Sequence, residues 1–255
     1  MKIAVRGGHN FLAKGASALI DETTEDRKVK DSVIKYLGQL GHTVLDVTPG
    51  NMGVNEDLSY GVAKANSWGA ELFISIHFNK AYSSYVGKIG TETWVYSKAD
   101  NIKLDEEVAG RIVNAIAGLG FVNRGVKERT DLYELKNTKM ASIIVEVCFV
   151  EATEDVALYK KLGPDKIGQV IAEAISNKKI NNVVKVEYDM KNLVTYYGDA
   201  DLFGAIMVAQ KNRCPLMKVA DYVASGLKAD KVIQIGGKVE DTNRYVSFKN
   251  AAKLV

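Results

Sequence analysis

Long apolar runs, strong net charge and cysteine are all scarce in this sequence, and each scarcity excludes a class of protein. No run of about 20 apolar residues occurs, so no segment is expected to span a membrane. The net charge is only +3, from 34 basic and 31 acidic side chains, and no basic stripe indicates nucleic-acid binding. The two cysteines, Cys148 and Cys214, do not support a disulfide framework. Cys148 is expected to be an inert thiol in a buried strand.

Histidine is equally rare, and two of the three histidines occupy equivalent positions. His9 follows a short apolar pattern that ends in Gly7-Gly8, and His77 falls where the apolar run beginning at Leu72 should end. In parallel α/β sheets the carboxyl ends of the strands line the ligand crevice, so these two side chains are expected to share one site. We interpret that site as a zinc site. His42 lies at the opposite edge of the sheet and is expected to be structural.

The third zinc ligand is expected to be a carboxylate. A catalytic zinc ion takes three protein ligands and leaves one position for water, and two histidines supply only two of the three. Candidates lie where the first long helix begins, at Asp21, Glu22, Glu25 and Asp26. A carboxylate at a helix N-terminus can equally cap the helix or interact with its dipole, so the residues alone leave the choice open.

Glu146 is a carboxylate within an apolar strand pattern, flanked by Val145 and Val147. An unpaired carboxylate is costly to bury, so Glu146 is either half of a buried ion pair with Lys or Arg or a functional group. The functional interpretation is a general base, or an acid–base group beside a metal-bound water. No nucleophilic Ser or Cys occupies an elbow-like turn, which disfavours a serine or cysteine hydrolase.

Strand and helix patterns alternate along the first part of the chain. This alternation predicts an α/β fold with a mostly parallel sheet and helices on both faces. Strands are expected at 2–6, 43–47, 71–78, 90–96, 132–135 and 142–150, and helices at about 23–40, 55–68, 103–119, from 157 onward and at 164–176.

Composition changes after residue 177, where a polar stretch at 178–187 is typical of a linker. The remaining residues, 188–255, predict a small α/β C-terminal domain. Its strands are expected at 192–197, 215–220 and 231–236, and its helices at about 201–212 and 246–254. Because about 68 residues is small for independent stability, this domain is expected to dimerise or to lean on a partner.

Taken in order, these residues resemble a known family, the zinc-dependent N-acetylmuramoyl-L-alanine amidases. The similar motifs are Gly8-His9, a Glu before the first long helix, and the segments at 75–79, 90–92 and 145–149. The resemblance covers about residues 1–177, and the layout looks like a clostridial phage endolysin. It implies hydrolysis, by a zinc-activated water, of the amide between the lactyl group of N-acetylmuramic acid and L-alanine in peptidoglycan.

The resemblance also implies roles for individual residues. His9 and His77 match the two histidine ligands of zinc, and Glu146 matches the catalytic glutamate. The family places its third ligand a fixed distance before the glycine that ends the first helix. That match falls on Glu22, with Glu25 as the runner-up. The chain departs from the family at Cys148 and near Met140, where Gly and Pro are usual; both are packing changes outside the ligand set.

The loop at 80–89 is expected to border a groove for the glycan–peptide strand, with Asn79, Tyr82 and Tyr85 as candidate substrate contacts. Residues 188–255 resemble the cell-wall-binding domain of such endolysins, on the segments 201–205, 214–217 and 232–237. This implies a cell-wall polysaccharide as the partner of the C-terminal domain, and a possible dimer through it. Some relatives also yield a separate tail fragment that pairs with the full protein, and Met190 could begin one here.

Two alternatives to the amidase remain open. One is a zinc endopeptidase that cuts the stem peptide, and the other is a non-catalytic wall-binding or adhesion protein with a structural metal or none. The N-terminus carries no signal-peptide pattern, so we expect synthesis in the host cytoplasm and action on the cell wall after release.

Overall fold

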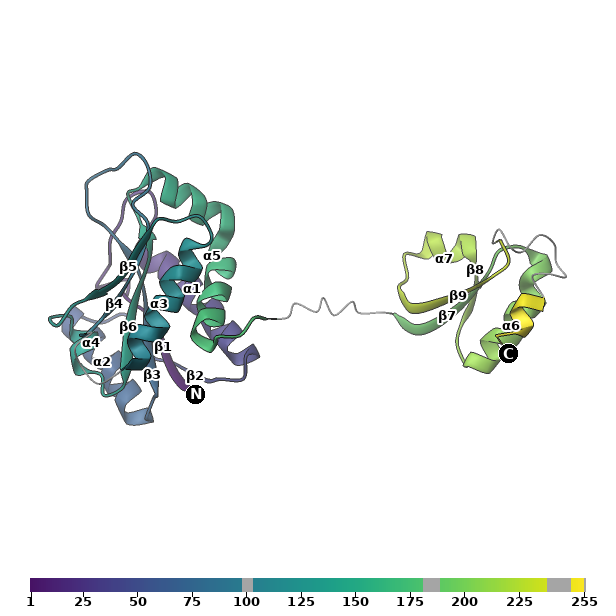
Figure 1. The fold of residues 1–255 in the computed structure, drawn as a ribbon, viewed down its shortest axis with the longest axis horizontal. Coiled ribbons are helices and arrows are strands. Elements are labelled where there is room, and N and C mark those ends of the chain that lie inside the picture. Colours follow the sequence, from purple (N-terminus) through teal and green to yellow (C-terminus); the bar gives the residue numbers. More distant parts are fainter. Residues whose placement is uncertain (98–102, 181–188, 238–248, 255) are drawn as a thin grey trace. The chain divides into compact units, whose positions relative to one another are not determined.

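The computed structural model describes residues 1–97, 103–180, 189–237 and 249–254, which Figure 1 draws in colour. Contacts divide the chain into two units, Met1–Asn181 and Asn182–Val255. The division falls within the expected linker at 178–187, of which residues 181–187 lie outside the described residues. In the part of the chain that is described, no helix is long and apolar enough to cross a membrane.

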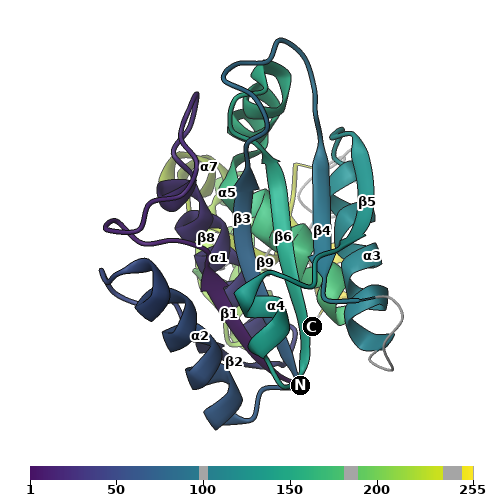
Figure 2. The ribbon, with the colours of Figure 1, turned by 90° about the vertical axis from the view of Figure 1, so that its left-hand side faces the viewer.

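The first unit is built on a six-stranded sheet with the strand order β2-β1-β3-β6-β4-β5 (Figure 2). β1, β2, β3 and β6 run parallel to one another, whereas β4 runs antiparallel to β6 and β5 runs parallel to β4. The predicted α/β fold with a mostly parallel sheet is confirmed. The strands are β1 (Lys2–Gly7), β2 (Thr43–Asp46), β3 (Leu72–Asn79), β4 (Thr91–Val95), β5 (Asn123–Glu128) and β6 (Ala141–Phe149).

Helices cover both faces of this sheet, as the view in Figure 1 shows. α1, α3 and α5 pack on one face, where the larger apolar core lies. α2 and α4 lie on the other face and contact each other. The helices are α1 (Glu22–Gln39), α2 (Val54–Trp68), α3 (Lys103–Ala117), α4 (Tyr133–Asn137) and α5 (Thr153–Ser176).

Alternation along β3 separates the apolar core from a polar face. The even-numbered side chains from Leu72 to Phe78 are buried in the core formed with α1, α3 and α5. Successive side chains of a strand point to opposite faces, so Ser75 and His77 lie on the face that carries α2 and α4. His77 therefore faces away from the larger apolar core.

Two elements of the first unit differ from the sequence prediction. The strand expected at 132–135 is wrong, because Tyr133–Asn137 is the helix α4; periodicity alone does not assign so short an apolar run. The strand β5 at Asn123–Glu128 was not predicted, because its half-exposed polar residues show no apolar alternation. The two helices expected after residue 157 form α5, which is kinked at Gly163 (φ 77°, ψ 158°).

The second unit is a three-stranded parallel sheet with the order β8-β7-β9. The expected strand at 215–220 is too long, since the chain turns into a helix at Val219. Of the helix expected at 246–254, residues 246–248 lie outside the described residues, and 249–252 are helical. The elements are β7 (Met190–Tyr196), α6 (Leu202–Asn212), β8 (Leu216–Lys218), α7 (Val219–Ser225) and β9 (Ala229–Ile235).

Candidate active site

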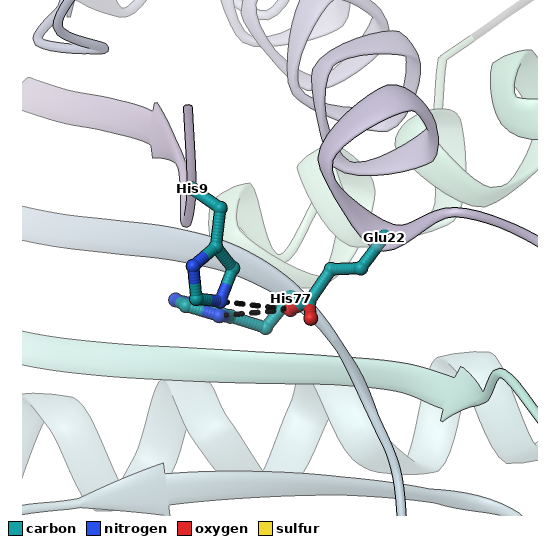
Figure 3. Close-up of side chains that lie close together, drawn as sticks. All are labelled: His9, Glu22 and His77. Atoms are coloured by element: carbon teal, nitrogen blue, oxygen red, sulfur yellow. Dashed lines mark hydrogen bonds and ion pairs between the residues drawn. The ribbon is translucent and has the colours of Figure 1, made fainter. Parts of the chain in front are cut away.

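The side chains of His9, Glu22 and His77 converge on one point at the carboxyl ends of β1 and β3 (Figure 3). His9 Nε2 lies 3.4 Å and His77 Nδ1 lies 3.1 Å from the same oxygen, Oε1 of Glu22. The two imidazole rings meet edge to face, with centroids 5.1 Å apart. Among the described residues, this is the only group of three potential metal ligands whose donor atoms all lie within 4.8 Å of one another.

Each of the four carboxylates at the start of α1 has a different set of partners. Asp21 is the N-cap and accepts a hydrogen bond from the Thr24 amide (2.9 Å). Glu25 accepts hydrogen bonds from Tyr159 (2.7 Å) and Lys28 (2.7 Å). Asp26 accepts from the amide of His9 (3.3 Å) and from Arg27 (3.1 Å). Glu22 alone places its carboxylate between the two imidazoles.

Two glycines allow the chain to approach this cluster closely. A Cβ atom on Gly8 would lie 2.0 Å from Cε1 of His77, and one on Gly15 would lie 2.3 Å from Oε2 of Glu22. Real Cβ contacts are never so short, so any larger residue at either position would displace a member of the cluster. The Gly8-His9 pair is therefore a geometric requirement of the site.

The Glu22 carboxylate is held ionised and fixed in place. Although burial opposes its charge, hydrogen bonds with His77 and His9 hold the pKa of Glu22 well below its usual range. The amide of Phe78 also donates to its Oε1 (3.0 Å), and the amide of Ala16 donates to its Oε2 (2.6 Å). One carboxylate and two imidazole nitrogens match the ligands of catalytic zinc. A tetrahedral ion with ligands at about 2.0–2.1 Å separates them by about 3.4 Å, close to the distances observed here, so the residues fit zinc.

Glu146 lies beside this cluster on β6. It is in register with His77 on β3 and with Glu92 on β4. Burial raises the pKa of Glu146 to about 8, although His77 opposes the shift. Its Oε2 atom is shielded from solvent and has no hydrogen-bond partner, and no described Lys or Arg forms an ion pair with it. The alternative of a buried ion pair therefore lacks a partner, and Glu146 keeps a free oxygen at the site.

A cavity of about 450 Å³ adjoins these residues and includes His9, His77 and Glu146 in its wall. Apolar side chains of α2, such as Val54 and Leu58, also line it, together with Tyr133 at the start of α4. The cavity is large enough for part of a sugar or peptide substrate, since ligand pockets measure about 300–1,000 Å³.

The three predicted substrate contacts lie at and beyond the end of β3. The amide of Asn79 already has protein partners, because its Nδ2 donates to Glu92 (2.8 Å) and its Oδ1 accepts from the Lys80 amide (2.7 Å). The rings of Tyr82 and Tyr85 stack with centroids 5.5 Å apart, and both are exposed (56% and 37%). A contact between any of these residues and substrate stays a prediction.

The sequence did not predict a network of buried charges behind His77. Arg6, which is fully buried, forms ion pairs with Asp57 (2.5 Å) and Glu134 (3.0 Å). Although burial opposes the charge of Glu134, Arg6 and His77 lower its pKa to about 2. Ser75 Oγ lies 2.9 Å from Nε2 of His77. The signal was present, since an arginine at the end of a buried strand demands buried carboxylates.

Residues 3–177 match the protein family described as N-acetylmuramoyl-L-alanine amidase. The chain belongs to this amidase family. The resemblance inferred from the sequence motifs is thereby confirmed, and the convergence of His9, Glu22 and His77 occurs within the matched region.

The chain is similar to a solved endolysin domain and to curated proteins that include an amidase. The catalytic domain of the CD27L endolysin targeting Clostridia difficile is 29% identical, with a TM-score of 0.63 over 71% of this chain and 99% of that one. An uncharacterized Clostridium perfringens protein is 55% identical over 188 residues, covering 73% of this chain and 55% of the relative. The Bacillus subtilis amidase LytC is 36% identical over 114 residues, or 43% of this chain and 22% of LytC. The chain thus spans about half or less of the length of these curated relatives.

Proposed function

We propose that residues 1–177 hydrolyse the amide bond between N-acetylmuramic acid and L-alanine in peptidoglycan. The observation that carries the proposal is the convergence of two histidines and a glutamate beside Glu146, in a chain of the amidase family. The likeness to a clostridial endolysin catalytic domain favours the endolysin setting, in which the enzyme is made in the host cytoplasm and acts on the wall after release.

His9, Glu22 and His77 would hold a zinc ion at this site. When bound, zinc supplies Lewis acidity toward water and toward the amide carbonyl. Glu146 takes one proton from the attacking water on its free Oε2, while the water oxygen bonds to the carbonyl carbon. As the carbon–nitrogen bond breaks, Glu146 returns that proton to the departing amine of L-alanine. A pKa near the working pH favours transfer in both directions, and burial moves the pKa of Glu146 toward that range.

The cavity and the loop at 80–89, which carries Tyr82 and Tyr85, would bind the glycan–peptide strand on either side of the reacting bond. The cavity supplies apolar wall and the Tyr133 ring, and the stacked, exposed rings of Tyr82 and Tyr85 offer flat apolar surface of the kind that sugar rings contact. Asn79 is also proposed to contact the substrate. Its side-chain amide would have to move slightly, because it is hydrogen-bonded to Glu92 and to the Lys80 amide.

Analysis of digested cell walls tests the reaction. An amidase is expected to release intact stem peptides that begin with alanine, which mass spectrometry of the soluble products identifies. Removal of metal with a chelator should abolish this release, and added zinc should restore it. Peptides cut within the stem would favour the endopeptidase alternative, and binding to walls without any release would favour the adhesion protein.

The second unit, residues 188–255, is proposed to bind cell-wall polysaccharide and to bring the enzyme to its substrate. Its support is its own parallel sheet and core, separate from the amidase unit. The full chain is expected to sediment with purified cell walls more completely than a chain ending at residue 180. Equal sedimentation of the two would contradict the proposal. Self-association through this unit stays a prediction, and analytical ultracentrifugation of the full chain tests it.

A further inference from the structure

We infer that Glu134, acting with Ser75 and Arg6, fixes the ring of His77 so that its Nδ1 atom faces the metal site. Glu134 is then a positioning residue, because it touches the far side of a ligand and not the substrate. The inference rests on the proposed zinc site. It adds to that site a set of supporting side chains from β1, β3 and α4.

The two nitrogens of His77 face different surroundings. Nδ1 lies 3.1 Å from Oε1 of Glu22, at the centre of the ligand cluster. Nε2 lies on the other side of the ring, 2.9 Å from Oγ of Ser75 and 3.5 Å from Oε2 of Glu134. The Ser75 hydroxyl is in turn 3.3 Å from Oε1 of Glu134.

Donor and acceptor roles follow from the charge of Glu134. An ionised carboxylate only accepts hydrogen bonds, and the ion pair with Arg6 (3.0 Å) keeps Glu134 in that form. The Ser75 hydroxyl therefore donates to Glu134 and offers its lone pairs to His77. Nε2 must then carry a hydrogen that points away from the metal site. Nδ1, which faces the ionised Glu22 at 3.1 Å, is the nitrogen whose hydrogen a zinc ion would replace. A carboxylate behind a ligand histidine fixes the tautomer and makes the ligand more basic.

Stability alone does not account for this arrangement. Arg6 and Ser75 are fully buried and Glu134 is 2% exposed, and burying such charges is costly even when they are paired. Apolar residues of similar size are often as stable or more stable in such positions. Arg6 already pairs with Asp57, so charge balance does not require a second carboxylate. Placement of that second carboxylate against His77 is the feature that needs a function.

Two matched substitutions separate positioning from general damage. Glu134→Gln and Asp57→Asn each neutralise one carboxylate that pairs with the buried Arg6, and each keeps the size of the side chain. Only Glu134 also approaches His77. In purified full-length protein, competition with a chromophoric chelator is expected to show zinc binding weakened by about 10- to 100-fold in Glu134→Gln. Asp57→Asn should bind zinc as tightly as the unmodified protein.

Nitrogen NMR of the histidines gives a readout that a merely structural role would not move. In the zinc-loaded protein, His77 is expected to show a protonated Nε2 and a metal-shifted Nδ1, and Glu134→Gln should lose this single tautomer. Ser75→Ala, which changes no charge, should also weaken zinc binding. It tests the inference if Glu134→Gln does not fold.

Three results would overturn the inference. The first is unchanged zinc affinity and unchanged His77 signals in the Glu134 and Ser75 variants. The second is an equal loss of affinity in Asp57→Asn, which would indicate general disruption around Arg6. The third is an unmodified protein that binds no zinc at all, which would remove the proposed function together with this inference; the first two would leave the proposed function standing.

Discussion

Replacement of Glu146 by glutamine is expected to lower the turnover number for wall hydrolysis by about 10²- to 10⁴-fold, the usual contribution of a general acid–base group. Glutamine keeps the size of the side chain but neither takes a proton from water nor returns one to the departing amine. The zinc content should stay at the level of the unmodified protein, because Glu146 lies outside the three-residue cluster. Activity on purified walls and metal content are measured on the same sample.

The same substitution, although it lowers activity, should raise the stability of the metal-free protein. The pKa of Glu146 is raised from 4.5 to about 8 in the folded protein, so its ionisation removes stability as the pH rises through that range. Metal-free Glu146→Gln lacks this loss and should have a higher Tm than metal-free unmodified protein above about pH 5. A variant that is inactive and less stable would indicate a structural role, and full wall hydrolysis by the variant would refute the catalytic one.

Replacement of Glu22 by glutamine is expected to weaken zinc binding by more than about 100-fold, beyond the loss typical of outer-shell residues. Its carboxylate is the negative charge between His9 and His77, and an amide is a poor ligand for zinc. Wall hydrolysis should fall with the metal content. Titration with a competing chelator and assay of wall clearing at limiting zinc measure both effects.

Glu25→Gln is the matched control for Glu22→Gln. Glu25 lies one turn further along α1 and was the runner-up as third ligand, yet its carboxylate accepts hydrogen bonds from Tyr159 and Lys28. Its loss should leave zinc binding and wall hydrolysis near their original values. If Glu25→Gln lost zinc and Glu22→Gln retained it, the assignment of the third ligand would be reversed.

Two residues of the candidate site that the sequence revealed share one signature. His77 and Glu146 are polar side chains in apolar strands, where each needs a reason to be present, and alternation places them on the same face. Arg6 is also a polar side chain in an apolar strand, but its role depends on its ion-pair partners Asp57 and Glu134. These two residues lie in helices whose polar patterns are ordinary. Such partners are brought together only by the packing of α2 and α4, which one sequence does not specify.

The fold was predicted best where burial imposes a strict pattern. Strands β1, β3 and β6 are buried and read clearly as apolar runs, whereas β5 is an edge strand whose polar residues gave no signal. The helix α4 was misassigned as a strand because its buried residues, Glu134 and Leu135, are too few to show a helical period. Because of that error, the sequence analysis did not place Glu134 next to Arg6 and His77.

The position of Glu146 within β6 couples the apolar core to the reaction. Its neighbours Val145 and Val147 are buried on the opposite face, against α1, α3 and α5. A slip of β6 by one residue would turn the carboxylate into that core and set a valine beside His77, and the desolvation of a charged group penalises every such misalignment. The valines therefore disfavour the one-residue slips that would remove Glu146 from the site, so selection for activity extends to side chains that never meet the cell wall.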